Sequence, residues 1–92
     1  MQMSVKVNLT PYFRDIVNRQ ETLTANGDTI GEIINDIDKR YPGFKKECID
    51  NQGKLYGFLE VYLNQVSAFP DELNRKVKDN DEVTILPVIG GG

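Results

Sequence analysis

Hydrophobic and polar residues alternate along several stretches of the chain, and this alternation predicts β-strands with one buried face. In the first stretch, Val5, Val7 and Leu9 fall on one side and polar residues separate them. Polar turns around Asn26-Gly27-Asp28 and Asp79-Asn80-Asp81 separate the stretches. The predicted strands cover residues 3–9, 21–25, 58–63 and 82–86, with a short edge strand at 66–69.

A period of three to four residues marks one helix between residues 29 and 41. Its apolar stripe consists of Ile30, Ile33, Ile34, Ile37 and Tyr41. Thr29 and Glu32 have the spacing of a capping box at its start, and Pro42-Gly43 ends it. Two further groups are expected to join the core. They are Tyr12 or Phe13 at one end of the core, and Phe44, Cys48, Ile49 and Leu55 under the sheet.

The order of these elements is strand, strand, helix, and then two or three strands. Because strands and helix do not strictly alternate, this order predicts an α+β fold, with a mixed sheet of four to five strands and one main helix packed on one face. A length of 92 residues fits a single domain. We expect the domain at residues 1–87 and a flexible Gly-rich tail at residues 88–92.

Charge and hydropathy narrow the choice of partners and location. The net charge is −3 and the basic residues are scattered, which argues against a nucleic-acid surface. The sequence shows neither a signal peptide nor an apolar run of the roughly 20 residues that a membrane helix needs. We therefore expect a cytoplasmic protein that contacts neither nucleic acid nor membrane.

Two residue types that carry much enzyme chemistry are scarce. The chain has no histidine and a single cysteine, Cys48. It therefore lacks the commonest general base and metal ligand, and one thiol builds neither a disulfide nor a multi-thiolate zinc site. These absences argue against most hydrolases, oxidoreductases and zinc modules, and we expect no metal site. Cys48 is interpreted as a half-buried structural residue, with a persulfide-relay thiol as the alternative.

The run Gly90-Gly91-Gly92 is the one feature of the sequence that suggests a chemical role. Glycine contributes no side chain to a core and loses the most entropy on ordering, so the run has no structural value there. A bare backbone is thin enough to thread a narrow channel and deliver a terminal carboxylate to a buried active site. Because a carboxylate is a poor electrophile, chemistry there requires activation by another protein, typically as an anhydride with AMP.

Two segments resemble the ubiquitin-like β-grasp sulfur carriers, a family that includes the small subunit of molybdopterin synthase and the thiamin sulfur carrier. One is residues 79–92, in which a polar turn, an apolar strand and a proline precede Gly-Gly. The other is residues 58–64, which resemble the family's central strand and Asn-containing turn. Asn80 and Gln65 stand where the family usually has turn glycines, and Val88 and Gly90 also depart from the molybdopterin branch.

The resemblance implies a mechanism and a set of partners. An E1-like enzyme would use ATP to adenylate Gly92, and a sulfur donor would convert the adenylate to a thiocarboxylate. The carrier would then insert its tail, Gly91 and Gly92 included, into a sulfur-accepting enzyme such as a synthase large subunit. The carrier itself would be a protein cosubstrate rather than an enzyme, would bind no cofactor and would be a monomer when free.

One face of the predicted sheet is a candidate docking patch. Phe58, Tyr62 and Leu86 point away from the predicted helix, and exposed apolar groups often mark partner sites. Scattered surface aromatics are the ordinary alternative. With the start of the tail, the predicted partner-binding residues are Phe58, Tyr62, Leu86, Pro87, Val88, Ile89 and Gly90.

Other functions remain compatible with the same residues. A protein modifier joined through Gly92 to lysines of its targets would use the same adenylation. A plain interaction domain would carry the glycines without using them. Within the sulfur-carrier interpretation, the pathways for molybdopterin, cysteine, methionine, thiamin and tRNA thiolation all stay open.

Overall fold

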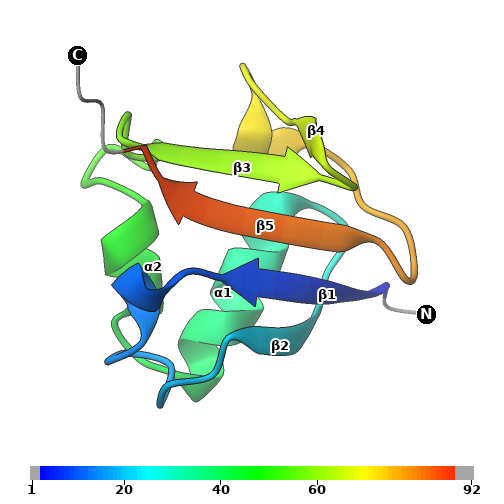
Figure 1. The fold of residues 1–92 in the computed structure, drawn as a ribbon. Helices are drawn as coiled ribbons and strands as arrows, with labels where there is room; N and C mark the ends of the chain where they lie inside the picture. The colour runs from blue at the N-terminus through cyan, green and yellow to red at the C-terminus, as the bar shows by residue number, and fades with distance from the viewer. Residues whose placement is uncertain (1–2, 89–92) are drawn as a thin grey trace.

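The computed structural model describes residues 3–88, which fold into one mixed sheet with helices on one side (Figure 1). The elements are β1 (Ser4–Leu9), η1 (Pro11–Phe13), β2 (Thr22–Asn26), α1 (Ile30–Arg40), α2 (Phe44–Cys48), β3 (Leu59–Leu63), β4 (Val66–Ser67), η2 (Glu72–Asn74) and β5 (Glu82–Pro87). The strand order is β2-β1-β5-β3-β4, with β1 and β5 parallel and the other neighbours antiparallel. The predicted α+β architecture is confirmed. None of the helices in residues 3–88 has the length and hydropathy to cross a membrane.

Helix α1 forms as its sequence pattern predicts. The Thr29 hydroxyl accepts a hydrogen bond from the Glu32 N–H at 3.2 Å, and the Glu32 carboxylate accepts one from the Asp28 N–H at 2.8 Å. The first bond satisfies an N–H group that the first helical turn leaves unpaired, and the second ties the residue before the cap to that turn. All four isoleucines of the stripe, Ile30, Ile33, Ile34 and Ile37, are fully buried against the sheet.

The core lies between α1 and the inner face of the sheet, where the alternating apolar residues of the strands meet. Phe13 closes one end of this core, and its ring centroid lies 5.3 Å from that of the buried Phe44. Tyr12 remains 49% exposed, so of the two candidates Phe13 is the residue that plugs the core. Phe44 and Cys48 are both fully buried, so their predicted positions under the sheet are confirmed. The interpretation of Cys48 as half-buried is wrong, because its exposed fraction is 0%.

The short helix α2 was not expected from the sequence. It begins after Gly43, which has a φ of 104°, and no side chain at that position caps it. Instead, the Asp38 carboxylate of α1 accepts hydrogen bonds from the N–H groups of Gly43 and Lys45, at 3.2 and 2.9 Å. The cap therefore comes from the preceding helix, and it holds the buried residues Phe44 and Cys48 in place.

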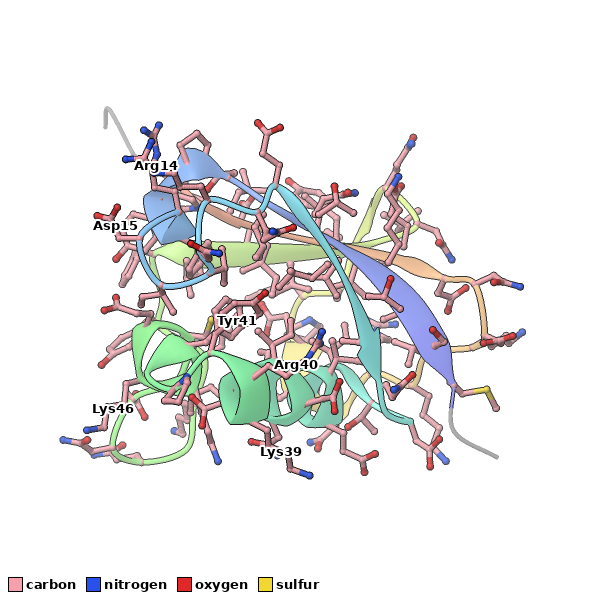
Figure 2. The ribbon with its side chains drawn as sticks, turned by 90° about the horizontal axis from the view of Figure 1, so that it is seen from below. Arg14, Asp15, Lys39, Arg40, Tyr41 and Lys46 are labelled. Carbon is pink, nitrogen blue, oxygen red and sulfur yellow. The ribbon has the colours of Figure 1, made fainter. Side chains whose placement is uncertain are left out.

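The free edge of β2 is covered by two side chains of α1. The Asp36 carboxylate accepts a hydrogen bond from the Asn26 N–H at 3.0 Å, and the Arg40 guanidinium donates one to the Thr24 carbonyl at 2.7 Å. Asp36 and Arg40 also form an ion pair at 3.4 Å. In Figure 2, Arg40 lies between α1 and the sheet, whereas Lys39 points away from it. The pair thus occupies main-chain groups that an edge strand otherwise leaves open.

The turn between β3 and β4 adopts a conformation that favours glycine. Asn64 and Gln65 have φ values of 52° and 71°, as in the tight hairpin turns that match strand twist. Asn64 suits this region, and its side chain also bonds to Asp81 and to the Glu82 N–H, at 3.0 and 2.9 Å. Glutamine does not favour this backbone region, and the exposed side chain of Gln65 makes no hydrogen bond with any of residues 3–88.

Replacing Gln65 by glycine is therefore expected to stabilise the domain. The left-handed conformation costs a non-glycine residue about 1–2 kcal/mol, and the greater entropy of glycine in the unfolded chain offsets part of that. We expect Gln65→Gly to raise the free energy of unfolding by roughly 0.5–1 kcal/mol in urea melts. Gln52→Gly is the matched control, because Gln52 is also exposed but its φ is not positive, so glycine there only adds entropy to the unfolded chain and should lower the stability. An equal gain from both variants would contradict strain at Gln65.

Candidate functional site: the base of the C-terminal tail

Strand β5, which leads into the tail, lies in the middle of the sheet. It pairs with β1 on one side, Val83 opposite Val7, and with β3 on the other, Ile85 opposite Val61. In Figure 1, the last residues of β5, the first residues of β3 and the segment η1 all lie at the same end of the strands. The glycine run is therefore attached to a strand that is held on both sides, and its point of attachment is fixed.

Pro87 lies at a position where its missing N–H removes no hydrogen bond between strands. The Val88 N–H donates to the Phe58 carbonyl at 2.6 Å, so even-numbered residues of β5 bond to β3. Because alternate residues of a strand face opposite neighbours, the nitrogen of Pro87 faces β1, which has already ended at Leu9. The proline thus ends pairing on the β1 side, while pairing with β3 continues to Val88.

Aromatic side chains surround the point where the tail leaves the sheet. The Phe58 ring lies 5.9 Å from that of Tyr12 and 5.5 Å from that of Tyr56. Tyr12, Phe58 and Val88 are each between 41% and 49% exposed, so they form an apolar surface. We call these four residues the tail-base cluster. Tyr12 also packs edge-on against the buried Phe13, at 5.0 Å, and this contact ties the cluster to the core.

The predicted docking patch is placed on the outer face of β3 and β5. Leu86 lies opposite Glu60, and Tyr62 lies opposite Thr84, so the predicted alternation of these strands is confirmed. The Tyr62 hydroxyl donates to the Glu60 carboxylate at 2.7 Å, and this bond raises the pKa of Tyr62. Leu86 and Pro87 are partly buried. Ile89, Gly90, Gly91 and Gly92, also named in the sequence prediction, lie outside the described residues.

The outer face of β1 and β2, by contrast, is polar. The Asn8 side chain bridges the hydroxyls of Thr22 and Thr84 at 3.4 and 3.3 Å, and Lys6 forms an ion pair with Glu82 at 3.7 Å. An apolar partner surface is better matched by the tail-base cluster and the adjoining ends of β3 and β5. The sequence prediction missed Tyr12 and Tyr56, because nothing local indicates that η1 and the loop before β3 meet.

Cys48 lies in the core, away from this surface. Burial, and secondarily the charges of Glu47 and Asp38, raises the pKa of its thiol to about 12. The nucleophilic thiolate is therefore nearly absent at neutral pH, which favours the structural role over the persulfide relay.

The raised pKa makes the stability of the domain depend on pH. The unfolded thiol ionises from pH 9 upward while the folded thiol stays protonated up to about 12, so the stabilisation is complete below pH 9 and lost above it. Between pH 8 and pH 10 we expect Cys48 to account for a loss of about 1.4 kcal/mol. The free energy of unfolding of the wild type and of Cys48→Ala is measured in urea at both pH values. The difference between the two slopes against pH gives the contribution of the thiol, because the tyrosines contribute equally to both proteins. Parallel slopes would contradict the buried, protonated thiol.

Comparison with known proteins relates the whole chain to one group. The model of the ThiS family matches residues 7–92. A curated relative, sulfur carrier protein CysO of Mycobacterium tuberculosis, is 34% identical over 93 residues, which cover 98% of this chain and 100% of the relative.

Solved structures agree with this relationship. The crystal structure of the Amycolatopsis orientalis BexX/CysO complex contains a chain 35% identical, with a TM-score of 0.87 over 96% of this chain and 99% of that one. The small archaeal modifier protein 1 of Methanosarcina acetivorans is 24% identical, with a TM-score of 0.81 over 100% of this chain and 99% of that one, and this likeness shows the fold alone. The ubiquitin-like β-grasp fold is thereby confirmed.

Proposed function

This chain belongs to the ThiS family, and from that premise we propose that it is a sulfur carrier protein whose reactive group is the carboxylate of Gly92. The observation that carries the proposal is the combined match of tail and fold. The family match extends through β5 to residue 92, and relatives at 34% identity over nearly the whole chain are named sulfur carrier proteins. A carrier of this kind is a cosubstrate rather than a catalyst.

The proposed chemistry begins with activation of the carboxylate. An E1-like partner adenylates Gly92 with ATP and releases pyrophosphate. A sulfur nucleophile, such as an enzyme persulfide, then displaces AMP and forms an acyl disulfide. A second thiol of the donor enzyme attacks the donor's own sulfur in that bond, which releases the terminal thiocarboxylate and leaves a disulfide on the donor. The carrier next presents this end to a sulfur-accepting enzyme. In this scheme the chain contributes the acyl group, the reach of its tail and a docking surface.

The structure supports the proposal because it fixes the point at which the tail leaves the sheet. The hydrogen bond from the Val88 N–H to the Phe58 carbonyl holds the last described residue against β3. Four residues follow Val88, and a fully extended chain spans at most about 3.6 Å per residue, so Gly92 can lie no farther than about 14 Å from Val88. An activating enzyme must therefore dock close to the tail base while its active site receives the end.

The tail-base cluster and Leu86 are the proposed contact surface for that docking. Phe58 and Tyr12 are anchored to the core through Phe13, so they are already ordered before a partner binds. Binding then costs less side-chain entropy than it would for free surface chains. The complex of BexX with CysO shows that a relative of this chain assembles with another protein.

Intact mass of the protein isolated from its host tests this function. A thiocarboxylate replaces one oxygen by sulfur, so a fraction of the chain is expected about 16 Da heavier than the polypeptide ending at Gly92. The gain should disappear when the host lacks the activating enzyme, which serves as the matched control. Lysine adducts of this chain on other proteins, without the mass gain, would indicate the protein modifier instead. A polypeptide that always extends past residue 92 would contradict both.

A further inference from the structure

Two arginines near the tail-base cluster have no partner within residues 3–88. The chain has four arginines, and the guanidinium groups of Arg40 and Arg75 each donate to a main-chain carbonyl, at 2.7 and 3.0 Å. Those two are therefore part of the fold. Arg14 and Arg19 are exposed, and their guanidinium groups form neither a hydrogen bond nor an ion pair with any of the described residues.

The loop between η1 and β2 brings these two arginines together. The Arg19 N–H donates to the Arg14 carbonyl at 2.7 Å, and the fully buried Val17 anchors the loop in the core. Both arginines line a surface hollow of about 170 Å³, which we call the arginine hollow. Its lining consists of Thr10, Pro11, Arg14, Arg19, Gln20 and Glu21. Because like charges repel, an anion placed in this hollow is favourable to both arginines.

A buried hydroxyl without a partner belongs to the same hollow. The Thr10 Oγ1 atom is the one buried side-chain oxygen or nitrogen in residues 3–88 that has no hydrogen-bond partner. Buried polar atoms are nearly always paired in folded proteins, so each exception calls for an explanation. A polar group that enters the hollow from another molecule supplies one.

The arginine hollow adjoins the surface proposed for docking. The register of β1 and β5 sets Leu9 opposite Ile85, and this places Thr10 beside Leu86. Thr10 continues the extended backbone of β1, and Leu9 is buried, so the Thr10 side chain faces the outer side of the sheet. Leu86 faces the same side. A protein that covers Leu86 thus also comes up against the hollow.

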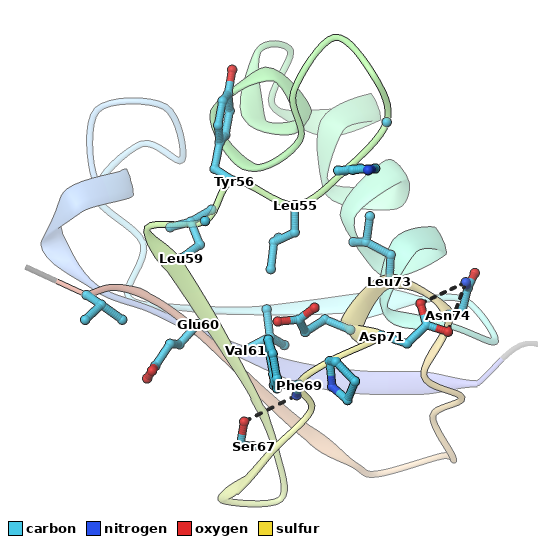
Figure 3. Close-up of a pocket in the computed structure, with 16 residues that line it drawn as sticks. Leu55, Tyr56, Leu59, Glu60, Val61, Ser67, Phe69, Asp71, Leu73 and Asn74 are labelled. Carbon is cyan, nitrogen blue, oxygen red and sulfur yellow. Dashed lines mark hydrogen bonds between the residues drawn. The ribbon is translucent and has the colours of Figure 1, made fainter. Parts of the chain in front are cut away.

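The acidic side chains of the outer face are already engaged. Glu60 points away from Leu55, as Figure 3 shows, and its carboxylate accepts the hydrogen bond of Tyr62 at 2.7 Å. Glu82 is paired with Lys6 at 3.7 Å. These carboxylates are therefore occupied by groups of the strands themselves.

Two acidic residues of the loop lie nearer, and they leave an excess of positive charge in the hollow. Glu21 lines the hollow, so the lining carries two positive charges and one negative charge. Asp15 does not belong to the lining. In Figure 2, Arg14 lies on the side of the sheet away from the helices, whereas Asp15 lies closer to them. The charge of the hollow is thus opposite in sign to the net charge of −3 on the whole chain.

We propose that the arginine hollow takes an acidic side chain of the adenylating enzyme that docks on the tail-base cluster, an inference that rests on the proposed function. The carboxylate of the enzyme pairs with Arg14 and Arg19, while a neighbouring apolar side chain of the enzyme covers Leu86. Charge pairs beside an apolar contact mainly set the choice of partner and the rate of encounter. Arg14 and Arg19 are therefore residues that determine specificity for the partner.

ATP–pyrophosphate exchange by the adenylating enzyme of the host, measured over a range of carrier concentrations, tests this contact. The double variant Arg14→Gln with Arg19→Gln is expected to raise the KM for the carrier about tenfold, because charge-assisted bonds are lost. The kcat should stay near that of the wild type, because the contact lies away from the activated carboxylate. Raising the salt concentration should increase the KM of the wild type more than that of the variant.

Three further variants separate charge from loop structure. Lysine at both arginine positions keeps the charge and should restore most of the affinity. Glu21→Gln removes the competing carboxylate of the hollow, so the KM should fall. Lys39→Gln removes an exposed cation of α1 outside the hollow, and it is the matched control that should leave the KM unchanged. The amide spectrum of each variant checks that it is folded.

Four results would overturn the proposal. An unchanged KM in the double glutamine variant would show that the arginines do not contact the enzyme. An equal rise with lysine at both positions would assign the effect to the loop rather than to charge. Amide shifts at residues 10–21 with sodium phosphate, but not with sodium chloride of equal ionic strength, would identify a free oxyanion as the occupant. Concentration-dependent shifts there in the protein alone would identify a second copy.

The same assay distinguishes this failure from failure of the proposed function. Exchange that is normal with the wild type and insensitive to the arginines would contradict only the acidic contact. A complete lack of exchange with the wild type would contradict activation at Gly92, and the contact inferred from it would fall as well.

Discussion

Removal of Gly92 is expected to abolish activation of the chain by its adenylating partner while leaving the fold unchanged. The shortened chain still ends in a carboxylate, but that group lies about 3.6 Å short of its place. A displacement of 1 Å already costs on the order of a hundredfold in rate, so we expect at least that loss. ATP–pyrophosphate exchange with the partner enzyme measures it, and thermal unfolding confirms that the domain is intact.

Two control variants separate the effect of tail length from the effect of the residue type at the end of the tail. Adding one glycine after Gly92 lengthens the tail by the same distance and should also lower the exchange. Gly92→Ala keeps the length of the tail and the carboxylate. The loss of exchange activity in this variant therefore reports how narrow the channel of the partner enzyme is. Undiminished exchange with the shortened chain would show that Gly92 is not the activated residue.

Truncation of Ile34 is expected to produce the largest loss of stability among these changes. Its side chain is fully buried at the centre of the α1 stripe, between helix and sheet. Ile34→Ala removes buried methyl groups and leaves a cavity that the surrounding core cannot fully close, which costs about 2–5 kcal/mol. Urea unfolding monitored by circular dichroism gives the change directly.

Asn35→Ala is the matched control for that measurement. Asn35 is the next residue of α1 but faces solvent, and alanine is the better helix former. Its free energy of unfolding should stay within about 0.5 kcal/mol of the wild type. A change near zero for Ile34→Ala would mean that α1 does not pack on the sheet through this stripe.

The sequence predicts well those elements whose apolar residues repeat locally. Helix α1, the alternation in β1, β3 and β5, and the edge position of β4 all follow from periodicities that a few neighbouring residues define. The parallel pairing of β1 with β5 has no such local origin, because it joins the two ends of the chain. The sequence pattern predicts a mixed sheet but does not say which strands are parallel.

The features that the sequence did not predict are those made by distant residues. The spacing of Phe44 and Cys48 fits a helix, but five residues are too few for a periodicity to stand out, and the cap comes from Asp38. The tail-base cluster joins Tyr12 to Phe58 across the sheet. Phe69 likewise resembles an ordinary strand residue until its exposure is known.

The carboxylate–guanidinium pair that α1 places along β2 has a consequence for crowded solution. A bare outer strand is a template on which another polypeptide can add as a further strand, and that route leads to fibres or to promiscuous complexes. With Asp36 and Arg40 occupying the Asn26 and Thr24 main chain, lateral growth of the sheet on that side first requires two bonds to break. A partner that joins this chain is therefore expected to recognise its side chains rather than extend the sheet at β2.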